Sequence, residues 1–212
     1  MTSQIDLSNK KLDLDATAQV AAKDPVLLGD LITGIAPENH NASLRYNCFR
    51  VLMRLACSHP ALLMPFWDHF AAEIHDSRAD QQYIGIRLLA ELIPTDAEHR
   101  FDSIFDLYFS MLTAPGLINA NQVAGVAGKI ALARPDLQPG ITRLLLTFHN
   151  LHLDAIRNDL VKSYAIESFD VYFDKVEETA PILKFIQGLV QSPSPRARKA
   201  AKEFLKKHSK GA

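Results

Sequence analysis

The chain has 212 residues, 48% of them apolar, and its 23 Lys and Arg against 24 Asp and Glu give a formal net charge of −1. The length suits one domain, or one elongated array, with a sizeable apolar core. A near-neutral balance excludes a general electrostatic attraction to nucleic acid or anionic membranes. Because no apolar run is long enough to cross a bilayer and residues 1–15 lack an apolar signal core, we expect a cytoplasmic protein.

The N-terminal region is predicted to cover the open end of a helical stack. Residues 1–14 are polar and read as a loose lead-in, and residues 15–22 read as a short helix capped by Asp15. A stack of repeats needs such a cover because its terminal unit has no neighbour to bury its apolar face. We therefore assign residues 1–23 to a lead-in and capping helix.

Residues 41–57 carry the clearest helical pattern in the chain. Leu44, Cys48, Val51 and Leu55 form one apolar stripe at helical spacing, and Asn41 or Ser43 is placed to cap the first turn. The two cysteines, at positions 48 and 57, are too far apart along one helix for a disulfide. Both are therefore expected to be reduced core residues.

The stripe recurs along the chain. If Cys48 is aligned with Gly85, Ala127, Leu160 and Ala201, the steps are roughly 33 to 42 residues, which is typical of helix-pair repeats. An apolar helical segment precedes each occurrence, and a proline lies near most of their starts. These first helices are predicted at residues 26–35, 61–74, 101–112, 141–151 and 182–190.

The second helices resemble those of the HEAT-like repeat family. The resemblance rests on an apolar residue followed by arginine, with a small or apolar residue three positions later, as in Leu44-Arg45 with Cys48 and in Ala197-Arg198 with Ala201. The same pattern occurs at Ile156-Arg157 with Leu160. The resemblance implies an all-α, right-handed α-solenoid of about five HEAT-like helix pairs over residues 24–207, followed by a disordered tail at 208–212. The alternative fold is a non-repeating helical bundle.

The connections between helices are predicted from turn-forming residues. Residues 34–41 and 75–80 read as turns, residues 113–121 as a longer loop, and residues 169–179 as an irregular segment. Residues 192–195 form the turn before a basic helix at 196–207.

Three residues inside helical patterns have two interpretations each. Trp67, the only tryptophan, is expected to be a buried structural side chain rather than a ligand platform. Gly125 and Gly128 weaken a helix and are better explained by a close helix approach than by a phosphate-binding loop, because no strand precedes them and no Lys-Ser/Thr pair follows.

No motif for enzyme chemistry stands out. His149 and His152 are three residues apart, and with Asp154 they are the nearest approach to a metal-ligand set, but a solvated helix end is the favoured interpretation. The sequence has no nucleophile elbow, dinucleotide fingerprint or paired-carboxylate motif. We therefore expect a non-enzymatic protein with no cofactor and no metal site.

The repeat alignment places Arg50, Arg87, Lys129 and Lys162 at one equivalent position. Equivalent positions in a stack form a row, and a basic row could bind an acidic peptide or a phosphate backbone. The favoured interpretation is a solubilising flank that pairs with acids such as Glu91 and Asp159. The basic C-terminal helix likewise reads either as a polar cap, which is favoured, or as a contact surface.

A protein-interaction or scaffold module is the leading functional hypothesis. A stack of helix pairs presents an extended concave surface that binds a protein partner or an acidic peptide segment, here through the four basic residues. The alternative is a DNA-binding or DNA-repair protein, since the HEAT-like alkylpurine DNA glycosylases are similar in length and repeat type. The near-neutral charge and the single tryptophan disfavour it. The sequence neither supports nor excludes a regulatory subunit or a lyase-type repeat protein. It does not indicate the oligomeric state.

Overall fold

The structure is a computed structural model that describes residues 5–208. The described residues form helices joined by turns, so the fold is all-α, as predicted. The chain divides into two compact units, Met1–Glu98 (unit 1) and His99–Ala212 (unit 2), a boundary that the sequence did not predict. Residues 1–4 of the predicted lead-in and 209–212 of the predicted tail lie outside the described residues.

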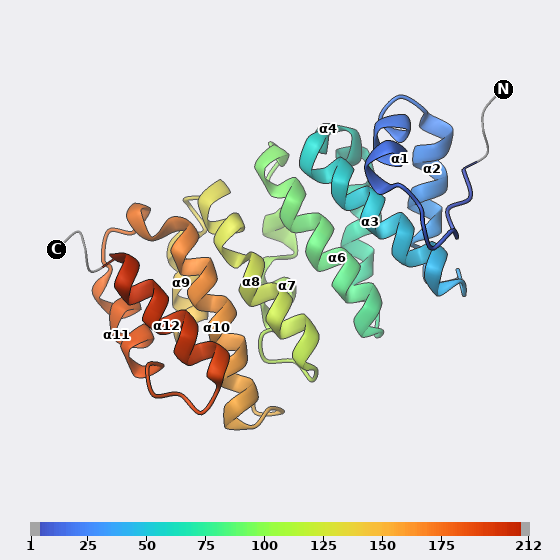
Figure 1. Cartoon of the computed structure of the whole chain (residues 1–212). Coiled ribbons are helices and arrows are strands. Elements are labelled where there is room, and N and C mark those ends of the chain that lie inside the picture. Colours follow the sequence, from blue (N-terminus) through green and yellow to red (C-terminus); the bar gives the residue numbers. More distant parts are fainter. Residues whose placement is uncertain (1–4, 209–212) are drawn as a thin grey trace. The chain divides into compact units, whose positions relative to one another are not determined.

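The helices of each unit follow one another along the chain (Figure 1). Unit 1 contains, in order, α1 (Leu14–Ala21), α2 (Pro25–Gly34), α3 (Ala42–Ser58), α4 (Pro60–Leu63), the 3-10 turn η1 (Met64–Phe66), α5 (Trp67–His75), α6 (Ala79–Leu92) and η2 (Ile93–Thr95). Unit 2 contains η3 (Arg100–Ser103), α7 (Phe105–Ser110), α8 (Leu117–Ala133), α9 (Gln138–Thr147), α10 (Ala155–Tyr172), η4 (Phe173–Lys175), α11 (Ala180–Gly188) and α12 (Pro195–His208).

Helix α3 is the centre of unit 1 and packs against α1, α2 and α6. Three members of the predicted stripe, Cys48, Val51 and Leu55, are fully buried. Asn41 caps the helix, because its Oδ1 accepts the Leu44 N–H at 3.1 Å. The apolar stripe therefore faces the core as the periodicity predicts.

Helices α3 and α6 run parallel to each other. Near their starts Arg45 pairs with Asp80 at 2.6 Å, and near their ends Cys57 Sγ lies 3.5 Å from Glu91 Oε2. A parallel arrangement of successive second helices is what a helix-pair repeat requires, because each returns to the same side after a first helix.

The small residue in the stripe of α6 has a packing cause. A Cβ on Gly85 would lie 2.8 Å from the Phe70 carbonyl oxygen of α5 and 3.0 Å from the Cβ of Glu73. The backbones of α5 and α6 therefore approach too closely for any larger residue. The predicted stripe contains a glycine at this position because α5 and α6 touch here.

The N-terminal helix is present, but its capping residue differs from the prediction. Asp13, not Asp15, caps α1, since its Oδ1 accepts the Ala16 N–H at 3.0 Å. Asp15 instead pairs with Arg54 of α3 at 2.8 Å. The lead-in is fixed to α3 because Asn47 Nδ2 donates to the carbonyls of Leu7 and Asn9, each at 2.9 Å.

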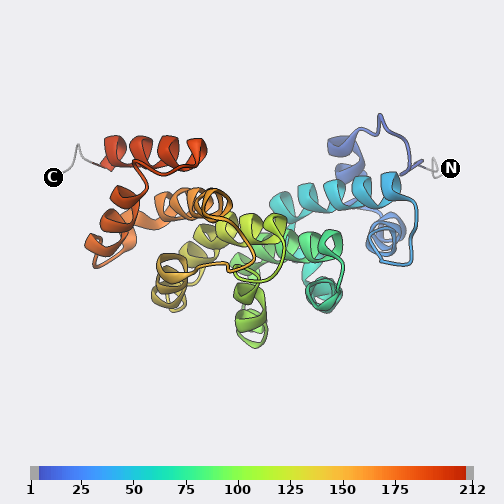
Figure 2. The same ribbon diagram turned by 90° about the horizontal axis from the view of Figure 1, so that it is seen from below.

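In unit 2 the helices α8, α10 and α12 lie side by side in chain order (Figure 1). Helices α9 and α12 lie on different sides of α10 (Figure 2). Helix α10 touches α8 most closely, because a Cβ on Gly128 would overlap the backbone of Ser168. Ser168 Oγ accepts the Gly128 N–H at 2.9 Å and donates to the Ala124 carbonyl at 2.5 Å. The close helix approach predicted from the two glycines is confirmed at Gly128, whereas a Cβ on Gly125 would make only ordinary contact with the Tyr164 ring, at 3.4 Å.

Several predicted boundaries are wrong. The predicted loop at 113–121 ends at Gly116, where φ is 114°, and α8 begins at Leu117. Helix α10 continues through residues 169–172 of the predicted irregular segment 169–179 and ends at Tyr172. The predicted first helix at 61–74 is broken into α4, η1 and α5, and that at 101–112 into η3 and α7. In α8, tertiary packing overrides local propensity, because Asn119, a poor helix former, is buried within it.

The tryptophan and one of the two cysteines are buried, and the other cysteine is exposed. Trp67 is 2% exposed, so the prediction of a structural indole is confirmed. Cys48 is buried, and burial raises the pKa of its thiol to about 12. Cys57 is exposed, which corrects the expectation of a core residue. The last turn of α3 extends beyond the buried stripe, so its cysteine faces solvent.

Candidate binding surface

The outward face of α3 carries the side chains most suited to binding. The helical period that buries Cys48 and Leu55 places Tyr46, Arg50 and Met53 on another side of the helix. Tyr46 is 58% exposed, and Arg50 and Met53 are half-buried. Tyrosine, arginine and methionine are the residue types enriched in protein interfaces relative to other surfaces.

Helix α6 extends this face with an aromatic side chain of its own. Tyr83 packs edge to face against Phe49, with ring centroids 5.3 Å apart. A small cavity of about 100 Å³ opens between α3 and α6 beside the Arg45–Asp80 ion pair. It is lined by Ala42, Arg45, Tyr46, Phe49, Asp80, Tyr83 and Ile84, so its walls are largely aromatic and aliphatic. Such a cavity fits a small apolar side chain.

The charge beside this cavity comes from Arg50. Its guanidinium carbon lies 5.5 Å from the centroid of the Tyr46 ring, which is a cation–π distance. Within residues 5–208 Arg50 forms no ion pair, whereas Arg45 pairs with Asp80 and Arg54 pairs with Asp15. Arg50 is therefore the arginine of α3 whose fork can bind an incoming carboxylate. Tyr46, Arg50 and Tyr83 are called the α3–α6 surface below.

The four residues of the predicted basic row occupy different positions along their helices. Arg50 and Arg87 are each the ninth residue of α3 and α6, which touch. Lys129 is the thirteenth residue of α8, and Lys162 is the eighth residue of α10. The alignment used Ala127 and Leu160, but the fully buried residues seven places into α8 and α10 are Val123 and Val161, matching Cys48 in α3. The sequence alignment chose the wrong residues as equivalents of Cys48 because the buried stripe of each helix extends over more than one turn, so that it offers several apolar residues for alignment.

The two lysines differ in their surroundings. Lys129 is exposed on α8. Lys162 pairs with Asp159 at 2.9 Å, and Asp159 also accepts a hydrogen bond from Ser192 at 2.6 Å. Lys162 thus follows the favoured interpretation, in which basic residues pair with neighbouring acids. A binding role for Arg50, Arg87 and Lys129 stays a prediction.

Several basic side chains of α12 form ion pairs with acidic side chains of α10. Arg196 pairs with Glu167 at 2.5 Å and lies 4.2 Å above the Tyr164 ring. Lys207 and His208 both contact Asp170, at 2.8 and 2.7 Å. These pairs lower the pKa of Asp170 although its burial raises it. Cations that are neutralised within the fold favour the cap interpretation of this helix over a nucleic-acid contact.

The histidine pair does not form a metal site. His149 and His152 are exposed in the turn after α9 and do not share a helix face. Among residues 5–208, no group of three or more His, Cys, Asp or Glu side chains is placed to hold a metal ion. Their exposure agrees with the favoured interpretation of a solvated helix end, although α9 ends at Thr147 rather than at residue 151.

A buried carboxyl in unit 1 was not detected from the sequence. Glu73 of α5 is 7% exposed and accepts a hydrogen bond from Gln81 Nε2 at 2.7 Å. Gln81 Nε2 also donates to the Ile35 carbonyl at the end of α2, at 3.0 Å. Burial raises the pKa of Glu73 to about 7 although the Gln81 hydrogen bond lowers it. The pair joins three helices in the core, which a periodicity argument within one helix cannot reveal.

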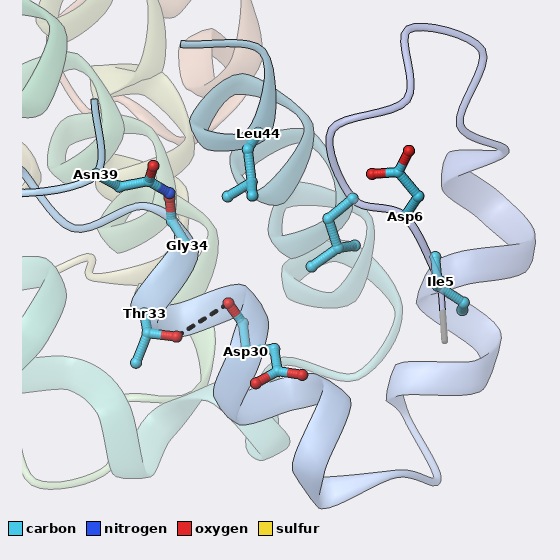
Figure 3. Close-up of a pocket in the computed structure, with 8 residues that line it drawn as sticks. Ile5, Asp6, Asp30, Thr33, Gly34, Asn39 and Leu44 are labelled. Carbon is cyan, nitrogen blue, oxygen red and sulfur yellow. Dashed lines mark hydrogen bonds between the residues drawn. The ribbon is translucent and has the colours of Figure 1, made fainter. Parts of the chain in front are cut away.

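A larger cavity of about 630 Å³ lies between the N-terminal segment and α2 (Figure 3). Asp6 and Asp30 line it together with Thr33, whose hydroxyl donates to the Asp30 carbonyl at 3.1 Å. Hydrogen bonds from Ser8 lower the pKa of Asp6, so its carboxylate is charged at neutral pH. Two carboxylates make this cavity unsuitable for an anion.

Comparisons of the chain with protein-family models, curated proteins and solved structures found no match. Between residues 5 and 208, no helix combines the length and the apolar character that a membrane span needs.

Proposed function

We propose that the chain is a non-enzymatic protein-interaction module built as an α-solenoid of HEAT-like helix pairs. A partner segment binds to the layer of second helices, and the α3–α6 surface is its principal contact. The observation that carries this proposal is the conjunction of the exposed Tyr46, the cavity beside Tyr83 and the adjacent Arg50 without an ion pair among the described residues.

The packing of the second helices supports the solenoid. In unit 1, α3 and α6 are parallel neighbours, and in unit 2, α8, α10 and α12 pack in chain order. In a HEAT-like array these helices line the concave surface, which is where such proteins bind their partners.

Apolar side chains on the second helices of unit 2 agree with a binding role for this layer. Ile118 and Leu132 of α8 and Ile156 and Val171 of α10 are each about half exposed. Isolated exposed aliphatic residues are common, but four on two adjacent helices provide apolar area that a partner can bury.

The partner segment is expected to be acidic with a small apolar anchor. Its carboxylate would bind Arg50, and its apolar side chain would fill the cavity between Tyr46 and Tyr83. The DNA-binding alternative ranks second, because the nearby Arg45 and Arg54 are already paired with carboxylates.

Quantitative affinity capture from the native cells tests the proposal. Proteins retained by the wild-type chain should be lost when Arg50 and Arg87 are both changed to glutamate, because the reversed charge repels an acidic segment. Arg157→Glu is the control, since Arg157 is an exposed residue of α10 that pairs with Asp154. A capture profile unchanged by R50E/R87E, or lost equally in R157E, would contradict the proposal.

A further inference from the structure

A cavity of about 530 Å³ in unit 2 lies between α9 and the segment that leads into α11. Its volume is within the range of small-molecule pockets in proteins. It will be called the α9–α11 groove. All of its lining residues belong to unit 2, so the inference drawn from it does not rest on the proposed function.

Part of the wall of the α9–α11 groove is apolar and stiff. Leu146 of α9 and Val176 of the opposite segment supply aliphatic surface, and Pro135, Pro139 and Pro181 line its edges. Each proline fixes its own φ angle, so both sides of the groove have little freedom to lose when a ligand binds.

Charged groups of both signs line the same cavity. Arg143 and Lys175 are exposed cations, and Glu177 and Glu178 are exposed carboxylates. Within the part of the chain that the structure describes, none of the four forms an ion pair. A ligand that carries one positive and one negative charge can therefore be complemented at both ends without breaking an existing pair.

A hydroxyl group adds a donor on the α9 side. Gln138 Nε2 donates to Thr142 Oγ1 at 2.8 Å, and Thr142 Oγ1 lies 2.9 Å from the Tyr172 hydroxyl oxygen. Tyr172 is buried, so its O–H needs an acceptor, and Thr142 is the one within reach. Thr142 then accepts twice, and its own hydrogen is left to donate to a group bound in the groove.

We propose that the α9–α11 groove binds a zwitterionic peptide of two or three residues with apolar side chains. Arg143 and the Thr142 hydroxyl bind the terminal carboxylate, and Glu177 and Glu178 bind the terminal ammonium. The side chains lie against Leu146, Val176 and the prolines. The charges set the orientation, and the apolar walls select the side chains.

Isothermal titration calorimetry of the full chain with the dipeptide Leu-Leu tests this site. The wild-type protein should bind Leu-Leu, and N-acetyl-Leu-Leu-amide, which lacks both charges, should bind at least tenfold more weakly. Arg143→Ala and the double variant E177Q/E178Q should each raise the Kd at least tenfold. Arg157→Ala should leave the Kd unchanged, because this exposed arginine of unit 2 pairs with Asp154 outside the groove.

Amide chemical-shift changes give a second measurement. In the wild-type protein, Leu-Leu should shift the amide resonances of Thr142, Leu146 and Val176. No binding of Leu-Leu at 10 mM, equal binding of the capped dipeptide, or shifts confined to residues outside the groove would each overturn the proposal. Because Arg143, Glu177 and Glu178 are exposed, their substitution should leave the melting temperature near that of the wild type.

Discussion

Glu73 is a buried carboxyl whose environment makes the stability of the fold depend on pH. Its carboxyl is buried against Gln81, and its pKa in the folded protein is about 7, above the ordinary value of 4.5. The folded state therefore holds the proton more tightly than the unfolded state does. The stabilisation is fully present below about pH 4.5 and is lost as the pH rises through 7.

We expect Glu73→Gln to remove this pH dependence. The glutamine keeps a hydrogen-bond acceptor for Gln81 but cannot ionise, so the variant should be more stable than the wild type at pH 8 by about 3 kcal/mol. Urea unfolding at pH 5, 6.5 and 8 measures the difference. Asp68→Asn, on the exposed side of the same helix, is the control. In this variant the free energy of unfolding should change with pH as it does in the wild type. If the free energy of unfolding changed equally with pH in E73Q and in the wild type, Glu73 would not titrate between pH 5 and pH 8.

Side chains with long-range partners are the ones that the sequence could not identify. Tyr46, Tyr83 and Glu73 each lie within a correct helical pattern, but their significance comes from contacts with another helix. Arg50 and Arg87 could be selected from the sequence because both follow a small buried residue by two positions. Spacing within one helix predicts the side on which a residue lies, but not what it meets there.

At the level of helices, the contact between α8 and α10 depends on Gly128. A Cβ at this position would overlap the Ser168 backbone, which cannot move as a side chain can. We therefore expect Gly128→Ala to lower the free energy of unfolding by about 1–3 kcal/mol through overpacking.

Gly125 is the matched control on the same helix. A Cβ there would lie 3.4 Å from the Tyr164 ring, which is ordinary contact, and alanine favours the helix by about 1 kcal/mol. Gly125→Ala should thus be neutral or stabilising. Chemical denaturation of both variants measures the contrast, and a G128A protein as stable as G125A would mean that the two helices are not so close.

The helices were predicted better than their ends and their alignment. Long amphipathic segments such as α3, α6 and α12 contain several helical turns, so the repeated apolar residues define which side of the helix is buried. The start of α8 was hidden by turn-forming residues. The alignment used Ala127, which lies about one helical turn after Val123, and Leu160, which immediately precedes Val161. Periodicity fixes the angle around a helix axis, whereas the position along the axis is set by caps and by packing on other helices.

For the whole molecule, the proposed solenoid predicts an elongated particle. A compact bundle of this length would have a radius of gyration of about 17 Å and therefore a maximum dimension of about 45 Å. Five stacked helix pairs at about 9–10 Å spacing should instead give a maximum dimension of about 60 Å. Small-angle X-ray scattering of the monomeric fraction distinguishes the two, and a value near that of the compact bundle would favour the non-repeating alternative.

The most direct test of the proposed function is site-specific photo-crosslinking in the native cells. A photoreactive phenylalanine is placed either at Tyr46 or at Ala72, an exposed position on the first-helix layer. The proposal predicts a discrete crosslinked protein from position 46 that is absent from position 72 and is lost on adding Arg50→Glu. No crosslink from position 46, or the same product from both positions, would contradict a partner bound at the α3–α6 surface.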